Sequence, residues 1–252
     1  MPRMMNDMME ESKIPGMQGF NFSGIRTEHL GATEYTLVTI AVDETGSTQG
    51  FEDDLRNSLI AAVDACKKSP RSDNLLLRVI RFSTSYLNGV EEIHGFKPLQ
   101  EIDSQNDYPL LNPEGMTPLY DVCYSSIGAI NVYAKKLMDD DFLANGIVFI
   151  ITDGHDNRSQ TTPIMIKDQV EKAVKGEDIE SLITILIGIN ASEFSGKLNR
   201  FKNEAGIDQY VDVGEANKGK LAKLAEFVSQ SISSQSQALG TGGPSQNIPA
   251  NI

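Results

Sequence analysis

The chain is poor in positive charge. Lys and Arg number 22 among its 252 residues, against 35 Asp and Glu, which gives a formal net charge of −13. Proteins that bind nucleic acid use clustered Lys and Arg side chains to neutralise phosphates, and no such cluster stands out here. Anionic membrane surfaces are disfavoured for the same reason. The composition therefore argues against nucleic-acid and membrane partners.

Long apolar runs and a disulfide framework are also missing. No stretch approaches the ~20 apolar residues that span a bilayer. The Met-rich start, MPRMMNDMMEE, lacks the apolar core of a secretory signal. The two cysteines, Cys66 and Cys123, lie in separate helical patterns, and we expect them to pack in the core without forming a disulfide. These features are typical of a protein of the reducing cytoplasm.

Alternating strand and helix patterns fill the middle of the chain. Apolar runs rich in β-branched residues occur at 35–42, 75–82, 147–152, 182–189 and 209–213, with a weaker run near 90–96. Between them, apolar residues recur at helical spacing, and Pro118 and Pro163 suit the start of two of these helices. The order predicts a doubly wound α/β fold, in which helices cover both faces of a mostly parallel sheet.

The two ends lack this periodicity. Residues 1–33 carry Gly, Asn, Ser and several Met without a visible period, so we predict a flexible arm. Residues 34–232 form the predicted domain. Residues 233–252 are rich in Ser, Gln, Gly and Pro, which predicts a disordered tail. The tail is either a solvated terminus or a peptide that docks on a partner.

Two of the apolar runs end at an aspartate. Asp43 follows the first and Asp153 follows the run at 147–152. Ligands of open α/β sheets gather beyond the carboxyl ends of the strands, so the two carboxylates would converge if the strands are neighbours. Thr45 and Ser47 follow Asp43 at alternate positions, and oxygen ligands at such spacing suit Mg²⁺. Each residue also has an ordinary interpretation as a turn residue or a helix cap, as does Thr117 before Pro118.

Three segments together resemble the von Willebrand factor A (VWA) domain. They are DETGS at 43–47, GMTPLYD at 115–121 and ITDGHDN at 151–157. The family's metal-ion-dependent adhesion site (MIDAS) has D-x-S-x-S after the first strand, a Thr in a G-T-P-L-like turn and an Asp after the fourth strand. The order and rough spacing match, and the resemblance extends over about 200 residues. The chain is most similar to the intracellular bacterial and phage type of this family.

The resemblance implies a metal-dependent interaction module and no enzyme activity. The metal, Mg²⁺ or Mn²⁺, would be surrounded by Asp43, Thr45, Ser47, Thr117 and Asp153. A partner protein would supply an Asp or Glu carboxylate as a further ligand. Thr45 replaces the usual Ser of the motif, and Met116 stands where many members have Gly. In the loop that follows Asp153, the residues 155–157 either form an exposed rim or support the site and the partner contact.

Two other interpretations remain open at the level of sequence. DETGS after an apolar strand also resembles the haloacid-dehalogenase superfamily, in which Asp43 would be a phosphoryl nucleophile and Asp153 or Asp156 would hold Mg²⁺. That interpretation leaves GMTPLYD unexplained. Alternatively, the chain is a VWA scaffold that uses no metal. The identity of the partner and the oligomeric state do not follow from the sequence.

Overall fold

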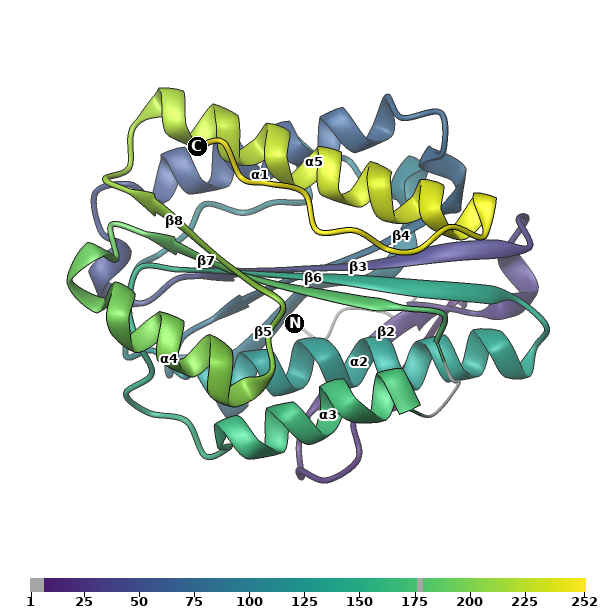
Figure 1. Cartoon of the computed structure of the whole chain (residues 1–252), viewed down its shortest axis with the longest axis horizontal. Coiled ribbons are helices and arrows are strands. Elements are labelled where there is room, and N and C mark those ends of the chain that lie inside the picture. Colours follow the sequence, from purple (N-terminus) through teal and green to yellow (C-terminus); the bar gives the residue numbers. More distant parts are fainter. Residues whose placement is uncertain (1–6, 176–178) are drawn as a thin grey trace.

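One sheet of eight strands forms the centre of the molecule (Figure 1). The computed structural model describes residues 7–175 and 179–252. The strand order is β1-β2-β5-β4-β3-β6-β7-β8. The bounds of the strands are Met9–Lys13 (β1), Asn21–Ile25 (β2), Glu34–Asp43 (β3), Leu75–Phe82 (β4), Val90–Pro98 (β5), Leu143–Thr152 (β6), Leu182–Ile189 (β7) and Gln209–Gly214 (β8). All six strands predicted from the apolar runs are confirmed.

Helices cover both faces of this sheet, which confirms the predicted α/β class. The bounds are Glu52–Lys67 (α1), Leu119–Asp139 (α2), Pro163–Lys175 (α3), Ser195–Ala205 (α4) and Lys218–Thr241 (α5). Helices α1 and α5 lie on one face, and α2, α3 and α4 lie on the other (Figure 1). Cys66 and Cys123 are free and buried, one in the core of each face. No helix in the described part of the chain is long and apolar enough to cross a membrane.

The direction of chain winding reverses at β3. Strand β4 pairs in parallel with one edge of β3, and β6 pairs in parallel with the other. Strands β7 and β8 continue the parallel set, whereas β5 runs antiparallel to β4. Crevices for ligands form at such a reversal, beyond the carboxyl ends of the strands. Asp43, the last residue of β3, and Thr152, the last residue of β6, both lie at this edge.

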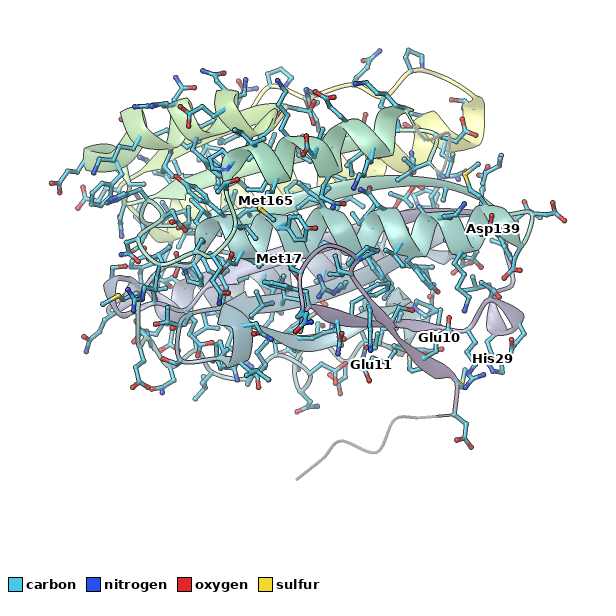
Figure 2. All side chains as sticks on the ribbon, turned by 90° about the horizontal axis from the view of Figure 1, so that it is seen from below. Glu10, Glu11, Met17, His29, Asp139 and Met165 are labelled. Carbon is cyan, nitrogen blue, oxygen red and sulfur yellow. The ribbon has the colours of Figure 1, made fainter. Side chains whose placement is uncertain are left out.

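The predicted flexible arm is wrong for the residues from Met9 onward. Strands β1 and β2 form an antiparallel hairpin, and β2 joins the edge of β5. Figure 2 shows this hairpin beside α2, with Met17 in its connecting loop. Phe22 is buried and packs against Phe96 and Tyr133, with ring centroids 5.9 and 6.3 Å away. These partners are far away in sequence, so no local period reveals the hairpin. Residues 1–6 of the predicted arm lie outside the described part.

The predicted disordered tail is wrong as well. Helix α5 continues to Thr241, and its buried polar side chains find hydrogen-bond partners. Gln235 donates to the carbonyl oxygen of Gly146 at 3.2 Å, and Ser236 accepts from Arg71 at 2.9 Å. The residues that follow the helix run back along α5 toward its start (Figure 1). Ile252 packs against the core, so the composition of this segment does not prevent it from being ordered.

Candidate metal site

The five residues predicted as metal ligands lie together at the carboxyl edge of the sheet. Asp43 ends β3, and Asp153 follows β6 directly. Because these two strands are parallel neighbours, with Val42 opposite Ile151, their final residues lie side by side. Asp43 is fully buried, and Asp153 is 7% exposed. The structure thus brings the two carboxylates into one crevice.

A chain of hydrogen bonds connects the hydroxyl groups to Asp153. The Thr117 hydroxyl donates to the Thr45 hydroxyl at 3.5 Å. Thr45 Oγ1 and Ser47 Oγ are 3.1 Å apart, and Ser47 donates to Asp153 Oδ1 at 2.8 Å. Asp43 accepts from the Thr45 backbone N–H at 2.9 Å and from the Thr152 hydroxyl at 2.7 Å. The polar groups therefore converge on one another, as the ligands of a common centre do.

Neither the Thr117 hydroxyl nor the Ser47 hydroxyl caps a helix, although the position of each residue would permit it. Helix α2 begins at Leu119, and no side chain of its N-cap residue caps it. Thr117 is instead buried, with 4% of the residue exposed, and its hydroxyl donates to Thr45. Similarly, Ser47 does not cap α1, whose N-cap residue is Phe51. The metal-ligand interpretation explains the position of both side chains, whereas the capping interpretation does not.

The two carboxylates are electrostatically strained as they stand. Burial, followed by the charge of Asp153, raises the pKa of Asp43 from 3.8 to about 7. Burial also raises the pKa of Asp153. Each shift means that a negative charge is unfavourable there, because burial excludes water from both carboxylates. A dication between the carboxylates would relieve this cost.

The spacing of the oxygens fits an octahedral metal. Mg²⁺ binds oxygen at about 2.1 Å, so adjacent ligand oxygens in its octahedron are about 3.0 Å apart. The three oxygen pairs in the chain from Thr117 to Asp153 are separated by 3.5, 3.1 and 2.8 Å. The donor set is two carboxylates and three hydroxyls; no cluster of three or more His, Cys, Asp or Glu side chains occurs in the described residues. Such a set suits a hard cation, and its two negative charges equal the charge of one dication.

Glu44 holds the site in place, although sequence reasoning did not single it out. It is 1% exposed, and its carboxylate pairs with Arg81 at 3.0 Å and accepts from the Tyr86 hydroxyl at 2.7 Å. It also accepts from the backbone N–H of Asn112. One buried acid thus ties the β4–β5 connection and the loop before Thr117 to the end of β3. Only the position of Glu44 next to Asp43 could have suggested this role.

The loop after Asp153 supports Thr117 and the start of α2. Asn157 Oδ1 accepts from the Thr117 backbone N–H at 2.8 Å. Asp156 and Ser159 accept from the backbone N–H of Tyr120 at 3.2 and 2.9 Å, so they cap α2 from another part of the chain. His155 lies against the ring of Phe194, with centroids 4.6 Å apart. Of the two predicted roles for residues 155–157, support of the site is the one that these contacts favour.

Two departures from the family motif are accommodated. Thr45 is 1% exposed, so its additional methyl group fits within the packed turn. Met116 is 54% exposed, so its side chain needs no room in the packed interior. The preceding Gly115 has a φ of +78°, and a Cβ there would lie 2.6 Å from Ser83 Oγ. Glycine is therefore needed at the turn that presents Thr117.

Comparisons with solved structures identify the fold. The pilus adhesin SpaC from Lactobacillus rhamnosus GG matches with a TM-score of 0.57 and 10% identity, over 85% of this chain and 32% of SpaC. Proximal thread matrix protein 1 from the mussel byssus matches with a TM-score of 0.51 and 16% identity, over 81% of this chain and 47% of that protein. This chain thus spans less than half the length of either protein. No protein-family model and no curated protein sequence matches it.

Proposed function

We propose that the protein is a metal-dependent interaction module, in which Asp43, Thr45, Ser47, Thr117 and Asp153 hold Mg²⁺ or Mn²⁺. The VWA-like sheet topology and the structural neighbours support this proposal. The observation that carries this proposal is the hydrogen-bonded chain of three hydroxyls that ends on Asp153 beside the buried Asp43. A bound dication would supply an electrophilic position that an anionic oxygen from a partner can fill.

The charge of the ligand set favours a carboxylate as the partner's ligand. Two aspartates balance a dication, and the three hydroxyls add no charge, so an additional anion is not repelled by excess negative ligands. The protein as a whole carries a net charge of −13, which repels an acidic partner at a distance. Attraction to such a partner therefore has to come from the metal itself, and binding should depend on it.

Exposed apolar side chains beside the site support a protein partner. Met116 is 54% exposed and Leu87 is 86% exposed. They lie on two segments that are joined by hydrogen bonds between Thr84 and Met116, of 3.0 and 2.9 Å. Exposed apolar groups next to a polar centre are typical of a protein-binding surface.

The dehalogenase-like alternative has less support. A phosphoryl nucleophile must be reachable by its substrate, whereas Asp43 is fully buried and accepts hydrogen bonds on both oxygens. We propose that the chain is not an enzyme and that it works in the cytoplasm. The last point rests on composition and on the two free cysteines.

Binding of a model carboxylate tests the proposal. The probe is a short Gly/Ser peptide with one central glutamate, titrated into the ¹⁵N-labelled protein and followed by NMR. In Mg²⁺ buffer without Mn²⁺, we expect the peptide to shift amide signals around residues 43–48 and 115–118. In EDTA we expect no shifts. The same peptide with glutamine in place of glutamate should not bind. Binding that is equal in EDTA and in Mg²⁺ would overturn the proposal.

Matched variants locate the effect. Asp153→Asn removes one ligand charge while keeping the size of the side chain, and it should abolish the metal-dependent shifts. Asp139→Asn is the control, because this exposed residue ends α2, away from the site where the helix begins (Figure 2). It should bind the peptide as the wild type does. If both variants lose binding equally, the peptide responds to the overall charge and the metal site is not its binding site.

A further inference from the structure

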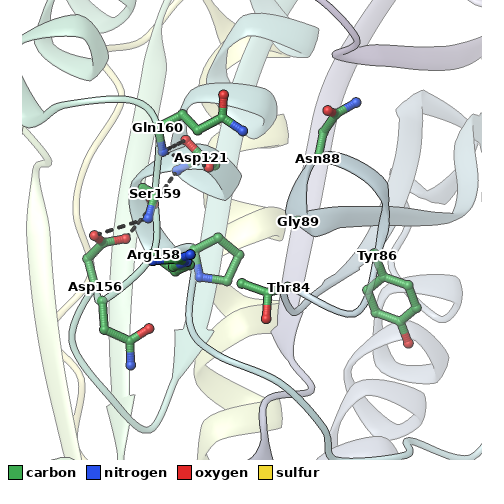
Figure 3. Close-up of a pocket in the computed structure, with 11 residues that line it drawn as sticks. Thr84, Tyr86, Asn88, Gly89, Asp121, Asp156, Arg158, Ser159 and Gln160 are labelled. Carbon is green, nitrogen blue, oxygen red and sulfur yellow. Dashed lines mark hydrogen bonds between the residues drawn. The ribbon is translucent and has the colours of Figure 1, made fainter.

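A polar groove of about 700 Å³ lies directly beside Thr117 (Figure 3). One wall is the β4–β5 connection, which contributes Thr84, Tyr86, Asn88 and Gly89. The other wall is the loop 156–160 after β6, and Pro118 also lines the groove. Pro118 follows Thr117, and Asn157 of the second wall binds the Thr117 backbone. A chain that places a carboxylate at the proposed metal would therefore continue into this groove.

Both walls of the groove are held rigidly. In the loop wall, the Asp121 carboxylate accepts from the backbone N–H groups of Gln160 and Thr161 at 3.0 and 2.8 Å. In the wall formed by the β4–β5 connection, the Asn88 side-chain amide donates to the carbonyl oxygen of Gly19 at 2.9 Å. Because the walls are fixed in advance, a bound segment would not have to order them, which lowers the entropic cost of binding.

The charges that line the groove are unequal in their accessibility. Asp121 is 3% exposed, and both of its oxygens accept backbone hydrogen bonds. Asp156 is half-buried and accepts from Tyr120 and Ser159. Arg158 is exposed, and its guanidinium has no hydrogen-bond or ion-pair partner in the described part of the chain. The two acids are thus compensated internally, and Arg158 is the charge that a ligand in the groove would meet.

We propose that this groove binds the partner segment next to the metal-bound carboxylate, and that Arg158 pairs there with a second acidic side chain of the partner. This inference rests on the proposed function of the metal site. It extends that function by defining the partner as a segment with two acidic residues. A guanidinium binds a carboxylate through two parallel N–H···O bonds, so Arg158 can distinguish an acid from a neutral residue at this position.

A basic residue at the second position is the competing expectation, because Asp121 and Asp156 also line the groove. The internal hydrogen bonds of both carboxylates argue against it, since a partner's lysine would have to displace backbone donors to reach them. The start of α2 also points its N–H groups at this loop, which makes the potential there more favourable to anions.

The test uses short Gly/Ser peptides in Mg²⁺ buffer, with dissociation constants measured by NMR titration. One peptide carries a single glutamate, and a series carries a second glutamate one to four positions away on either side. A matched series has lysine at the second position. We expect at least one two-acid peptide to bind about three- to fivefold more tightly than the single-acid peptide. The lysine series should show no gain.

Two variants assign the gain to Arg158. Arg158→Gln should reduce the advantage of the second glutamate to less than about twofold, measured against the affinity of the same variant for the single-acid peptide. Arg26→Gln is the matched control, because Arg26 is also exposed but follows β2 at the opposite edge of the sheet. It makes the same change in net charge and should keep the full advantage.

The outcomes separate the two proposals. If the single-acid peptide does not bind in a metal-dependent way, the proposed function fails, and this inference fails with it. If it binds but no second acid improves binding, or if the gain survives in Arg158→Gln, only the role of Arg158 is refuted. A gain from lysine instead of glutamate would refute it as well and would assign the groove to a basic residue.

Discussion

Replacing Asp43 by Asn should stabilise the metal-free protein and remove most of the stabilisation that a bound metal gives. Without a metal, Asp43 carries an unfavourable buried charge, since its pKa is raised from 3.8 to about 7. Asn removes this charge and can keep the hydrogen bonds. Its oxygen can accept from Thr45 N–H, and its amide can donate to the Thr152 hydroxyl. That hydroxyl then donates to the Gly154 carbonyl oxygen, which lies 3.1 Å away.

The magnitude follows from the pKa. A shift of one pKa unit corresponds to 1.36 kcal/mol, so the full cost of ionising Asp43 amounts to about 4 kcal/mol. We expect Asp43→Asn to gain about 1–4 kcal/mol in EDTA above pH 7, a rise in Tm of about 2–10 °C for a chain of this size. When the free metal concentration is one hundred times Kd, metal binding raises the free energy of unfolding of the wild type by ~2.7 kcal/mol. The variant should lose most of that gain.

The effect of pH has a defined sign. The pKa of Asp43 in the folded state is raised above its value in the unfolded state, so the contribution of this group to the stability of the metal-free protein is most favourable below about pH 4. Stability should then fall as the pH rises toward 7, because folding opposes ionisation of this group. In Asp43→Asn this part of the pH dependence should disappear. Thermal unfolding between pH 4 and 8, with EDTA or with Mg²⁺, measures both effects.

A single result would refute this reasoning. If Asp43→Asn is less stable than the wild type in EDTA at pH 8, and Mg²⁺ stabilises both proteins equally, then Asp43 is not a strained metal ligand. Its carboxylate would instead be a structural acceptor whose loss weakens the end of β3.

Three more predictions concern the parts that hold the site and the sheet. Glu44→Gln should cost about 2–4 kcal/mol in urea unfolding, because it leaves Arg81 without its buried partner. Glu91→Gln, which affects the more exposed side of the same arginine, should cost less than about 1 kcal/mol, and equal costs would contradict this account. Phe22→Ala should cost about 3–5 kcal/mol in the same assay, since the ring is buried against Phe96; a surface-like cost would mean that the hairpin is not part of the core. Deletion of residues 244–252 should lower Tm by several degrees in calorimetry, because Ile252 packs against the core, whereas a free tail would leave Tm unchanged.

The sequence predicts the central strands, and the convergence of the candidate ligand side chains, because the signals for both are local. The apolar run before Asp43 ends where β3 ends, and the run before Asp153 ends where β6 ends. The arrangement of Thr45 and Ser47 after Asp43 depends on a short turn, so spacing along the chain corresponds to spacing in the crevice. Thr117 is the exception, since a Thr before Pro is an ordinary helix start, and only the family resemblance assigned it to the site.

The ends of the chain could not be predicted because their order comes from distant contacts. Strand β1 has no buried residue, and it exists because β2 supplies a pairing edge. The polar half of α5 resembles a disordered segment by composition, but the buried Gln235 donates to Gly146 on β6 and the buried Ser236 accepts from Arg71. Likewise, the roles of Glu44 and Asn157 depend on residues that the fold brings to them from far along the chain.

The most direct test of the central claim is paramagnetic line broadening by Mn²⁺ in the ¹⁵N-labelled protein. At substoichiometric Mn²⁺, amide signals of residues 43–48, 115–118 and 152–157 should broaden first, and excess Mg²⁺ should restore them. Asp153→Asn should abolish this broadening, whereas Asp139→Asn should not. A protein with a net charge of −13 can also attract Mn²⁺ to its surface without a site. Broadening that is scattered over surface acids, and equal in the wild type and Asp153→Asn, would contradict a metal site at the end of β3.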